Sequence, residues 1–500
     1  MNYPKAGISI GLALFVSGQF LLGADKKQKS AAVPTPPSST PAPLLDKTPN
    51  MTLEDAVALA LKQNPQVLEA IQLIEQTKGQ VITVRAEALP NVTLSSAFDQ
   101  SASSLVKPPL DLGSTSSSSQ IPQEKTWNIS LQATQVLYSP AVGAAIKIAK
   151  LTIDSNYFNL RDVVDQTIST VRQQFYNVLL DRELIKVQEQ SVELLKSQLQ
   201  DQQNRFQAGT VPQFNVLQAQ VALANQLPQL IKARETYSVD LLTLARTLGI
   251  QYNPLRAGQP PLNALGDLTV HERSINENEA IRIAKEQRAF LKEQRQSILI
   301  QLQQVKVALA GYLPTLNADA GYQVRNSPFV AGNPLDEIVQ GWFFGVNGSW
   351  AVFDSGATYG RVKTARAQLE SSKVNYDDAV LQVELQVQQA IASLKQARET
   401  IDSQIKSVEE ATEALRLSRE RLNTGVGVQL DVLNAQVALL TAQSNQLQAE
   451  HDYNVALAQF EYATGIATRY DELFDDPILH KKPYSDKSAA SAKGAISPKD

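Results

Sequence analysis

The sequence of 500 residues contains no cysteine and only three histidines, and these absences exclude several classes of protein. Without cysteine the chain has no disulfide, no thiolate metal ligand, no cysteine nucleophile and no lipid-modified N-terminal cysteine. His271, His451 and His480 lie far apart and form no pair spaced for zinc. Phosphate-binding glycine loops and serine-hydrolase motifs are also absent. We therefore expect no enzyme, no metal site and no cofactor.

Excess charge of one sign and long apolar runs are lacking too. The 46 basic and 50 acidic residues nearly cancel, so nucleic acid is not an expected partner. An apolar stretch at 8–22 follows Lys5 but is too short for a comfortable transmembrane helix. We predict a secretory signal peptide over 1–24, with an uncleaved membrane anchor as the alternative. No other segment is apolar enough to span a bilayer as a helix, so membrane insertion would require β-strands.

The chain repeats itself with a long period. Residues 205–223 (RFQAGTVPQFNVLQAQVAL) and 421–439 (RLNTGVGVQLDVLNAQVAL) align at an offset of 216 residues. Gly249 and Gly465 keep the same offset, which indicates a duplicated half and not a short solenoid repeat. We divide the chain into a Pro/Ser-rich linker at 25–50, a first repeat at 51–250, a connecting segment at 251–274, a second repeat at 275–466 and a partly disordered tail at 467–500.

Each repeat carries a long helical signal. Apolar residues recur every seven positions in both halves, which favours supercoiled helices over 141–207 and 357–423, each roughly 100 Å long. The first-half positions are Val164, Val171, Val178, Ile185, Val192, Leu199 and Phe206, and adding 216 gives an apolar residue every time. Shorter helices are predicted over 52–63, 65–88, 214–248, 277–311 and 430–464, with a kink or break at Pro228.

Ahead of each long helix the apolar period falls to two, which predicts β-hairpins at about 90–138 and 314–353. The four strands alternate apolar and polar residues over 10–12 positions, as in a membrane barrel; a small soluble sandwich is the alternative. Trp127, Trp342 and Trp350 sit in these strands, where aromatic residues mark the membrane interface. Four strands cannot close around a pore, but three chains supply twelve, so we predict an oligomer, most simply a homotrimer.

The order of helix, hairpin, long helix, tight turn and helix, present twice, resembles the TolC-like outer-membrane efflux proteins. The resemblance covers about residues 51–466 and is carried by the paired turns quoted above and by TLEDAVALALKQNP at 52–65. It implies a mostly helical fold with a small β part, in which a trimeric twelve-stranded barrel continues into a long periplasmic helical barrel. It also implies a passive export duct in a tripartite efflux or type I secretion system. The implied partners are a periplasmic adaptor, an inner-membrane pump and outer-membrane lipid.

The resemblance places the periplasmic gate at the turns. Asp431 matches an entrance-lining aspartate, and three copies would form an acidic ring, whereas Asn434 and Asn215 stand where relatives carry further aspartates. An Asp or Asn near a helix start also satisfies free N–H groups, so Asn215 and Asp431 are alternatively helix caps. The tips that dock the adaptor would include Gly209, Thr210, Gly425 and Gly427, and we expect Gly209 and Gly425 to end the long helices in the left-handed conformation.

A soluble periplasmic coiled-coil scaffold or adaptor is the competing function. It accounts for the heptads but leaves the four strands and their tryptophans unexplained. The sequence favours the export duct.

Overall fold

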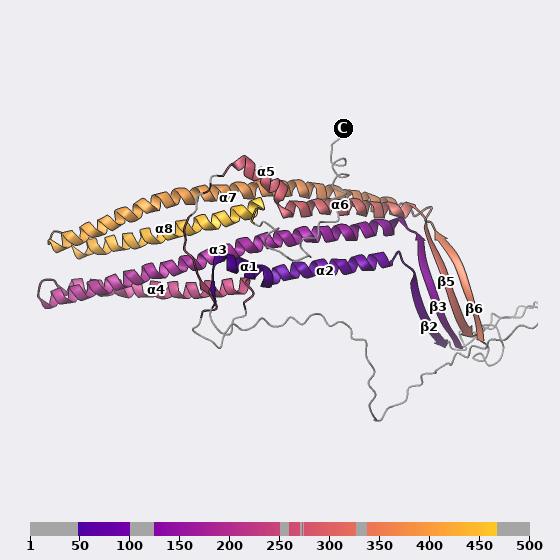
Figure 1. Cartoon of the computed structure of the whole chain (residues 1–500), viewed down its shortest axis with the longest axis horizontal. Helices are drawn as coiled ribbons and strands as arrows, with labels where there is room; N and C mark the ends of the chain where they lie inside the picture. The colour runs from indigo at the N-terminus through magenta and orange to yellow at the C-terminus, as the bar shows by residue number, and fades with distance from the viewer. Residues whose placement is uncertain are drawn as a thin grey trace, which may run out of the picture. The chain divides into compact units, whose positions relative to one another are not determined.

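A computed structural model describes residues 49–100, 125–250, 260–270, 273, 275–326 and 338–467. All of them belong to one unit, Leu44–Asp500. The predicted signal peptide, nearly all of the linker, the two hairpin loops, most of the connecting segment and the tail beyond residue 467 lie outside the described residues. Figure 1 shows paired helices that lead into a group of strands.

The first repeat has the four predicted helices: α1 (Leu53–Gln63), α2 (Pro65–Ala86), α3 (Pro140–Gln207) and α4 (Gln213–Thr247). Thr52 caps α1 in a capping box with Asp55, and Asn64 ends α1 and caps α2, with Pro65 at the first helical position. Helix α4 runs unbroken through Pro228, so a break there is wrong. Both Pro228 and Ala224, whose carbonyl loses its partner, are exposed, and water can satisfy that group.

The second repeat contains α5 (Glu277–Gln287), α6 (Ala289–Leu309), α7 (Ala357–Asn423) and α8 (Gln429–Thr464). The single helix predicted over 277–311 is wrong, because Arg288 adopts a ψ of 118° and divides it. Arg288 is 3% exposed, and its guanidinium donates to the Tyr462 carbonyl and lies 3.7 Å from the Tyr462 ring centroid. Tertiary contacts therefore create the break that Asn64-Pro65 encodes locally in the first repeat.

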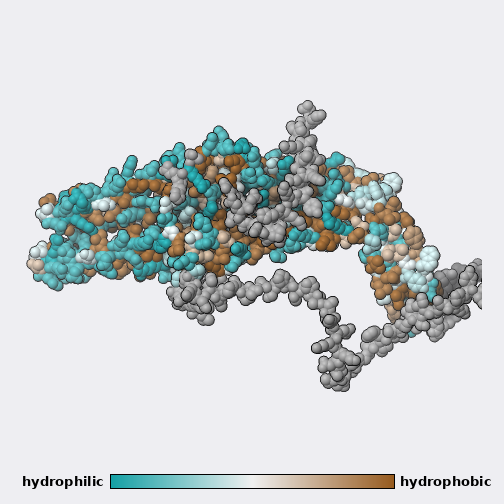
Figure 2. Space-filling view, viewed as in Figure 1, coloured by the Kyte–Doolittle hydropathy of each residue, from teal (hydrophilic) through white to brown (hydrophobic). Residues whose placement is uncertain are grey.

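The strands form one antiparallel sheet in the order β2 (Asn91–Gln100), β3 (Lys125–Tyr138), β5 (Thr315–Asn326) and β6 (Ile338–Ser349). One apolar row crosses all four strands through Leu94, Leu131, Tyr322 and Trp342. The row behind it on the opposite face is Ser95, Ser130, Gln323 and Gly341. The predicted alternation is confirmed, and Figure 2 shows hydrophobic residues gathered over the strands.

Two features of the strands escaped the sequence analysis. Strand β3 is longer than predicted and shifts register between Val136 and Tyr138. A second, two-stranded parallel sheet pairs β1 (Asn50–Met51) with β4 (Asn263–Ala264) and so ties the start of the first repeat to the connecting segment.

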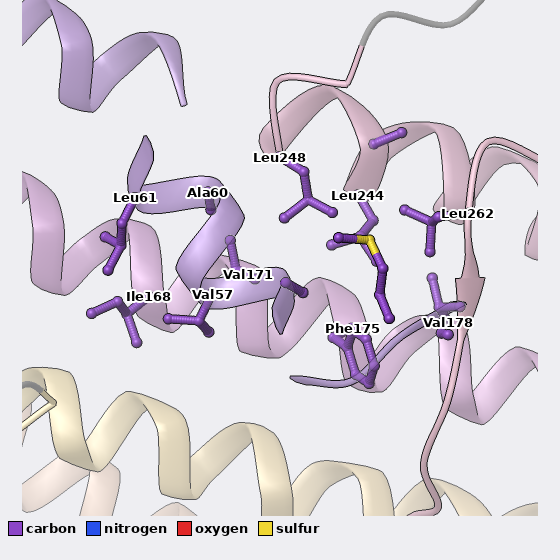
Figure 3. Close-up of a cluster of buried hydrophobic side chains, with 14 of the residues drawn as sticks. Val57, Ala60, Leu61, Ile168, Val171, Phe175, Val178, Leu244, Leu248 and Leu262 are labelled. Carbon is purple, nitrogen blue, oxygen red and sulfur yellow. The ribbon is translucent and has the colours of Figure 1, made fainter. Parts of the chain in front are cut away.

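The largest apolar core lies where α1 packs against α3, and it also includes residues of α2 and of the end of α4. Figure 3 shows Val57, Ala60 and Leu61 of α1 in this core with side chains of α3, of the end of α4 and of the connecting segment. The labelled residues are Ile168, Val171, Phe175 and Val178 of α3, Leu244 and Leu248 at the end of α4, and Leu262 just before β4. A second cluster joins α5, α6, α7 and α8, and only a small third cluster, Leu415, Val432 and Ala435, lies near the tip of α7 and α8. The hairpins are thus anchored in two cores and extend well beyond them.

Candidate functional site

The turns that follow the two long helices are built alike. Gly209 and Gly425 have φ of 73° and 77°, which confirms the predicted left-handed ends. Thr210 N donates to Arg205 O at 2.9 Å, and Val426 N donates to Arg421 O at 3.0 Å, the long bond of a Schellman motif in each repeat. A Cβ added at either glycine meets nothing within 4 Å, so glycine is required by its backbone conformation and not by space.

At Gly427, glycine is favoured by close contacts and not by a left-handed backbone conformation. Its N–H donates to Arg421 O at 2.9 Å, and an added Cβ would lie 3.0 Å from the Arg421 Cβ and 3.1 Å from backbone atoms of residues 421 and 422. Even a Cβ is therefore crowded at this position, so the tight turn favours glycine.

Asp431 and Asn215 occupy the third position of α8 and α4, not the N-cap. The N-caps are Val428 and Pro212, whose side chains have no acceptor. The Asp431 carboxylate accepts the Val428 N–H at 3.5 Å, whereas the Asn215 side chain makes no capping bond to α4. Capping therefore accounts for Asp431 weakly and is wrong for Asn215. Asp431 and Asn434 are both exposed and lie one turn apart, on one face of α8.

Two polar contacts join the hairpin tips, and the sequence analysis missed both. Gln202 Nε2 on α3 donates to Gln429 Oε1 on α8 at 3.2 Å, with both side chains buried. Nearby, an Arg205 guanidinium nitrogen donates to Asn423 Oδ1 at 3.4 Å. The repeat gives no signal for the first contact, because Ser418 stands at the position equivalent to Gln202.

The tryptophans lie at the sheet, as predicted, although Trp350 falls one residue beyond β6. Trp127 pairs with Phe98 across β2 and β3, and Trp342 pairs with Tyr322 across β5 and β6. The Trp350 indole N–H donates to Tyr312 O at 3.1 Å. Trp342 and Trp350 are exposed and Trp127 is half-buried, and all three lie at the sheet end of the molecule, away from the turns.

Within the described part of the chain, no helix is both long and apolar enough to cross a membrane. In those same residues, no group of three or more His, Cys, Asp or Glu side chains is placed to hold a metal ion. His451 is buried, and its Nε2 lies 2.6 Å from Asn177 Oδ1 while its Nδ1 lies 2.9 Å from Asp452 Oδ1, so it links α8 to α3 as a packing residue.

Comparisons with known proteins agree with this architecture. The family model described as "Outer membrane efflux protein" matches residues 56–250 and 280–466. The chain is 24% identical to the alkaline protease secretion protein AprF of Pseudomonas aeruginosa, with 84% of this chain and 85% of AprF covered. It is 22% identical to the outer membrane protein TolC of Escherichia coli, with 70% and 72% covered. The CmeC outer membrane channel of Campylobacter jejuni matches with a TM-score of 0.70 at 19% identity, covering 83% of this chain and 85% of that one.

The duplicated long helical hairpins attached to a small antiparallel sheet are a fold that this chain shares with the CmeC outer membrane channel. The family model covers most of both repeats, and the chain therefore belongs to the outer membrane efflux protein family. It is an efflux channel of the outer membrane with a periplasmic helical domain, and it is not an enzyme. The export duct is confirmed, and the soluble scaffold or adaptor is set aside.

Proposed function

We propose that three copies of this chain assemble into the working channel, which receives cargo from an inner-membrane pump through a periplasmic adaptor. The sheet supports this proposal first. Strands β2 and β6 are its two edges, and their apolar side chains, among them Leu94 and Phe344, are exposed in the single chain. Unpaired edges and an apolar face are both unfavourable in isolation, and edge-to-edge pairing of three sheets removes them.

The helices carry the observation on which the trimer chiefly rests. Helix α3 packs against α6 and α8 of the other repeat, in addition to α2 and α4 of its own. In the duplication, α7 corresponds to α3, and α2 and α4 correspond to α6 and α8. If the same rotation relates all successive repeats around the channel, α7 must pack against α2 and α4 of the next copy. The α7 face that would receive them carries exposed Val374, Leu381 and Leu385.

We derive the register of this proposed interface from one intramolecular contact. Ser169 Oγ on α3 donates to Ala458 O on α8 at 3.4 Å. A shift by the repeat offset converts this pair into Leu385 on α7 and Leu242 on α4 of the neighbouring copy. Both leucines are exposed in the single chain, by 53% and 37%, and apolar contact between copies would bury them.

Because the chain has no cysteine, this contact can be tested directly. In the double variant Leu242→Cys/Leu385→Cys, mild oxidation or a short thiol cross-linker should give a ladder on a non-reducing gel that ends at three chains. Each single variant should stay monomeric, because the predicted contact joins different residues. The matched control Val221→Cys/Leu385→Cys uses another exposed α4 residue and should not link. A ladder that stops at two chains, or none at all, would contradict the trimer.

The gate of this channel is assigned to the start of α8. Three Asp431 carboxylates would surround the axis at the tip, with Asn434 one turn farther along each helix and Asn215 at the equivalent position of α4. The exposure of Asp431 and its long, weak capping bond support a role outside its own helix. A ring of carboxylates at a constriction attracts cations and repels anions.

The turns around Gly209, Thr210, Gly425 and Gly427 are assigned to adaptor docking. Exposed apolar residues stand beside them, namely Phe214, Val426 and Val428. Apolar side chains gathered at an exposed turn are typical of a protein-binding surface. At the opposite end, Trp127, Trp342 and Trp350 are assigned to the membrane interface. The relative AprF is named for protease secretion, so cargo can include polypeptides as well as small molecules.

A further inference from the structure

A pair of aspartates bridges α3 and α4 at the edge of the large apolar core. Asp181 is 9% exposed and follows Leu180, the last α3 residue of that core. The Asp240 side chain on α4 is a hydrogen-bonding neighbour of the Asp181 carboxyl group. Asp181 Oδ2 is buried and has no hydrogen-bond partner among the described residues. Burial first, and then the neighbouring Asp240 charge, raise the pKa of Asp181 to about 7.

In the second repeat, the equivalent contact between α7 and α8 has no carboxylate. The positions equivalent to Asp181 and Asp240 are Ala397 and Ala456, and both alanines are buried. The surrounding residues correspond in kind, with Tyr237 matched by Tyr453, Val178 by Leu394, Leu241 by Leu457 and Leu244 by Phe460. Packing of this helix pair therefore does not require acidic residues. The first repeat retains two of them, one buried and one half-buried, where two neighbouring negative charges would be unfavourable.

The other ionisable groups around the pair are already engaged. Arg182 points to the connecting segment, where it donates to Ala264 O at 2.9 Å and to Gly266 O. Tyr237, one turn before Asp240 on α4, has its pKa raised by burial. His451 approaches from α8 one turn away and is held by Asn177 and Asp452. Glu183 pairs with Arg182 and Lys186 on the outer side of α3.

We propose that Asp181 and Asp240 share a single proton and act as a pH-sensitive latch between α3 and α4. With one proton bound, the carboxyl group donates to the facing carboxylate and the seam is closed. When that proton is lost to solvent, two carboxylates face each other in a poorly hydrated seam, and their repulsion loosens the hairpin at the core edge. The α7–α8 hairpin has no such pair. The two halves of the periplasmic domain thus respond differently to pH.

The latch lies within one chain, so it is independent of the proposed trimer, and its test uses the full-length protein in detergent. Nitroxide labels on cysteines at exposed Gln190 and Lys232 report the α3–α4 distance by double electron–electron resonance. Labels at Lys406 and Gln448, the equivalent positions, report the α7–α8 distance. Between about pH 5 and about pH 9, with EDTA present throughout, the first distribution should broaden with a midpoint near the value of about 7, and the second should not change.

Variants separate the latch from general effects of pH. Asp181→Ala/Asp240→Ala copies the second repeat, so it should fold and keep a narrow distribution at every pH. Asp240→Asn leaves one carboxyl group and should also remove the transition. The control Asp201→Asn changes an exposed α3 aspartate and should keep it. An unchanged α3–α4 distance in the parent protein, or a transition that survives the double substitution, would overturn the latch. A transition seen only without EDTA would instead indicate a bound cation and would overturn it equally.

Discussion

Asp431 and Asn215 stand at the same position of the two repeats and differ essentially by one charge. Replacing Asp431 by Asn removes three carboxylates from the proposed ring while preserving side-chain size. We expect divalent cations to block the conductance of the reconstituted channel roughly tenfold less well, the factor that corresponds to about 1.4 kcal/mol of lost cation binding. The long capping bond to Val428 contributes little, so folding should be unaffected.

The reverse substitution at the equivalent position of the first repeat tests whether α4 also lines the entrance. Asn215→Asp adds a carboxylate to the equivalent helix start and should strengthen the block if α4 also lines the entrance. Planar-bilayer conductance at graded magnesium concentrations measures both variants. If Asp431→Asn leaves the block unchanged, Asp431 serves only its own helix.

Two neighbouring residues of strand β2 lie on opposite faces of the sheet. Leu94 is 74% exposed in the apolar row, whereas Thr93 points to the polar face. If the apolar row meets lipid, Leu94→Arg should cost about 2–4 kcal/mol near the bilayer midplane and lower the yield of folded protein in outer membranes, whereas Thr93→Arg should be tolerated. Equal yields of the two variants would contradict a lipid-facing row.

Elements of this chain were predictable where a pattern repeats over many residues. The heptads define α3 and α7 within a residue or so, and period-two alternation identifies all four strands of the sheet. Glycine with left-handed geometry was predictable at Gly209 and Gly425 because it depends on local backbone alone. The same locality explains the success at Asn64-Pro65, where capping and proline act together.

Features that depend on distant partners were not predictable. The break at Arg288 follows from its burial against Tyr462, 174 positions away in sequence. Gln202 meets Gln429 only because two separately formed hairpins pack together. The Asp181–Asp240 pair left one trace in the sequence, the substitution of two aspartates for two alanines between otherwise similar repeats.

At the scale of the whole molecule, the two repeats are held together by contacts that the duplication does not copy. Arg288 joins the α5–α6 junction to Tyr462 at the end of α8, and its guanidinium lies 3.6 Å from the Asp162 carboxylate on α3. Burial raises the pKa of Asp162, and the Arg288 charge partly opposes this rise. Glu293 on α6 also faces this carboxylate, and its pKa is raised by burial and then by the Asp162 charge.

Removing Arg288 should therefore destabilise the protein in a pH-dependent way. Arg288→Ala leaves the Asp162 carboxylate buried without its cation, which should cost about 3 kcal/mol of unfolding free energy at neutral pH. A carboxyl group with a raised pKa in the folded state stabilises the fold below its unfolded pKa, and that contribution is lost as the pH rises through the folded value. The loss in Arg288→Ala should thus be smaller in acid than at neutral pH. Denaturant titration of the full chain in detergent measures this, and Arg288→Ala/Asp162→Asn should recover part of the neutral-pH loss. Equal losses at both pH values would assign the role of Arg288 to its contact with Tyr462 alone.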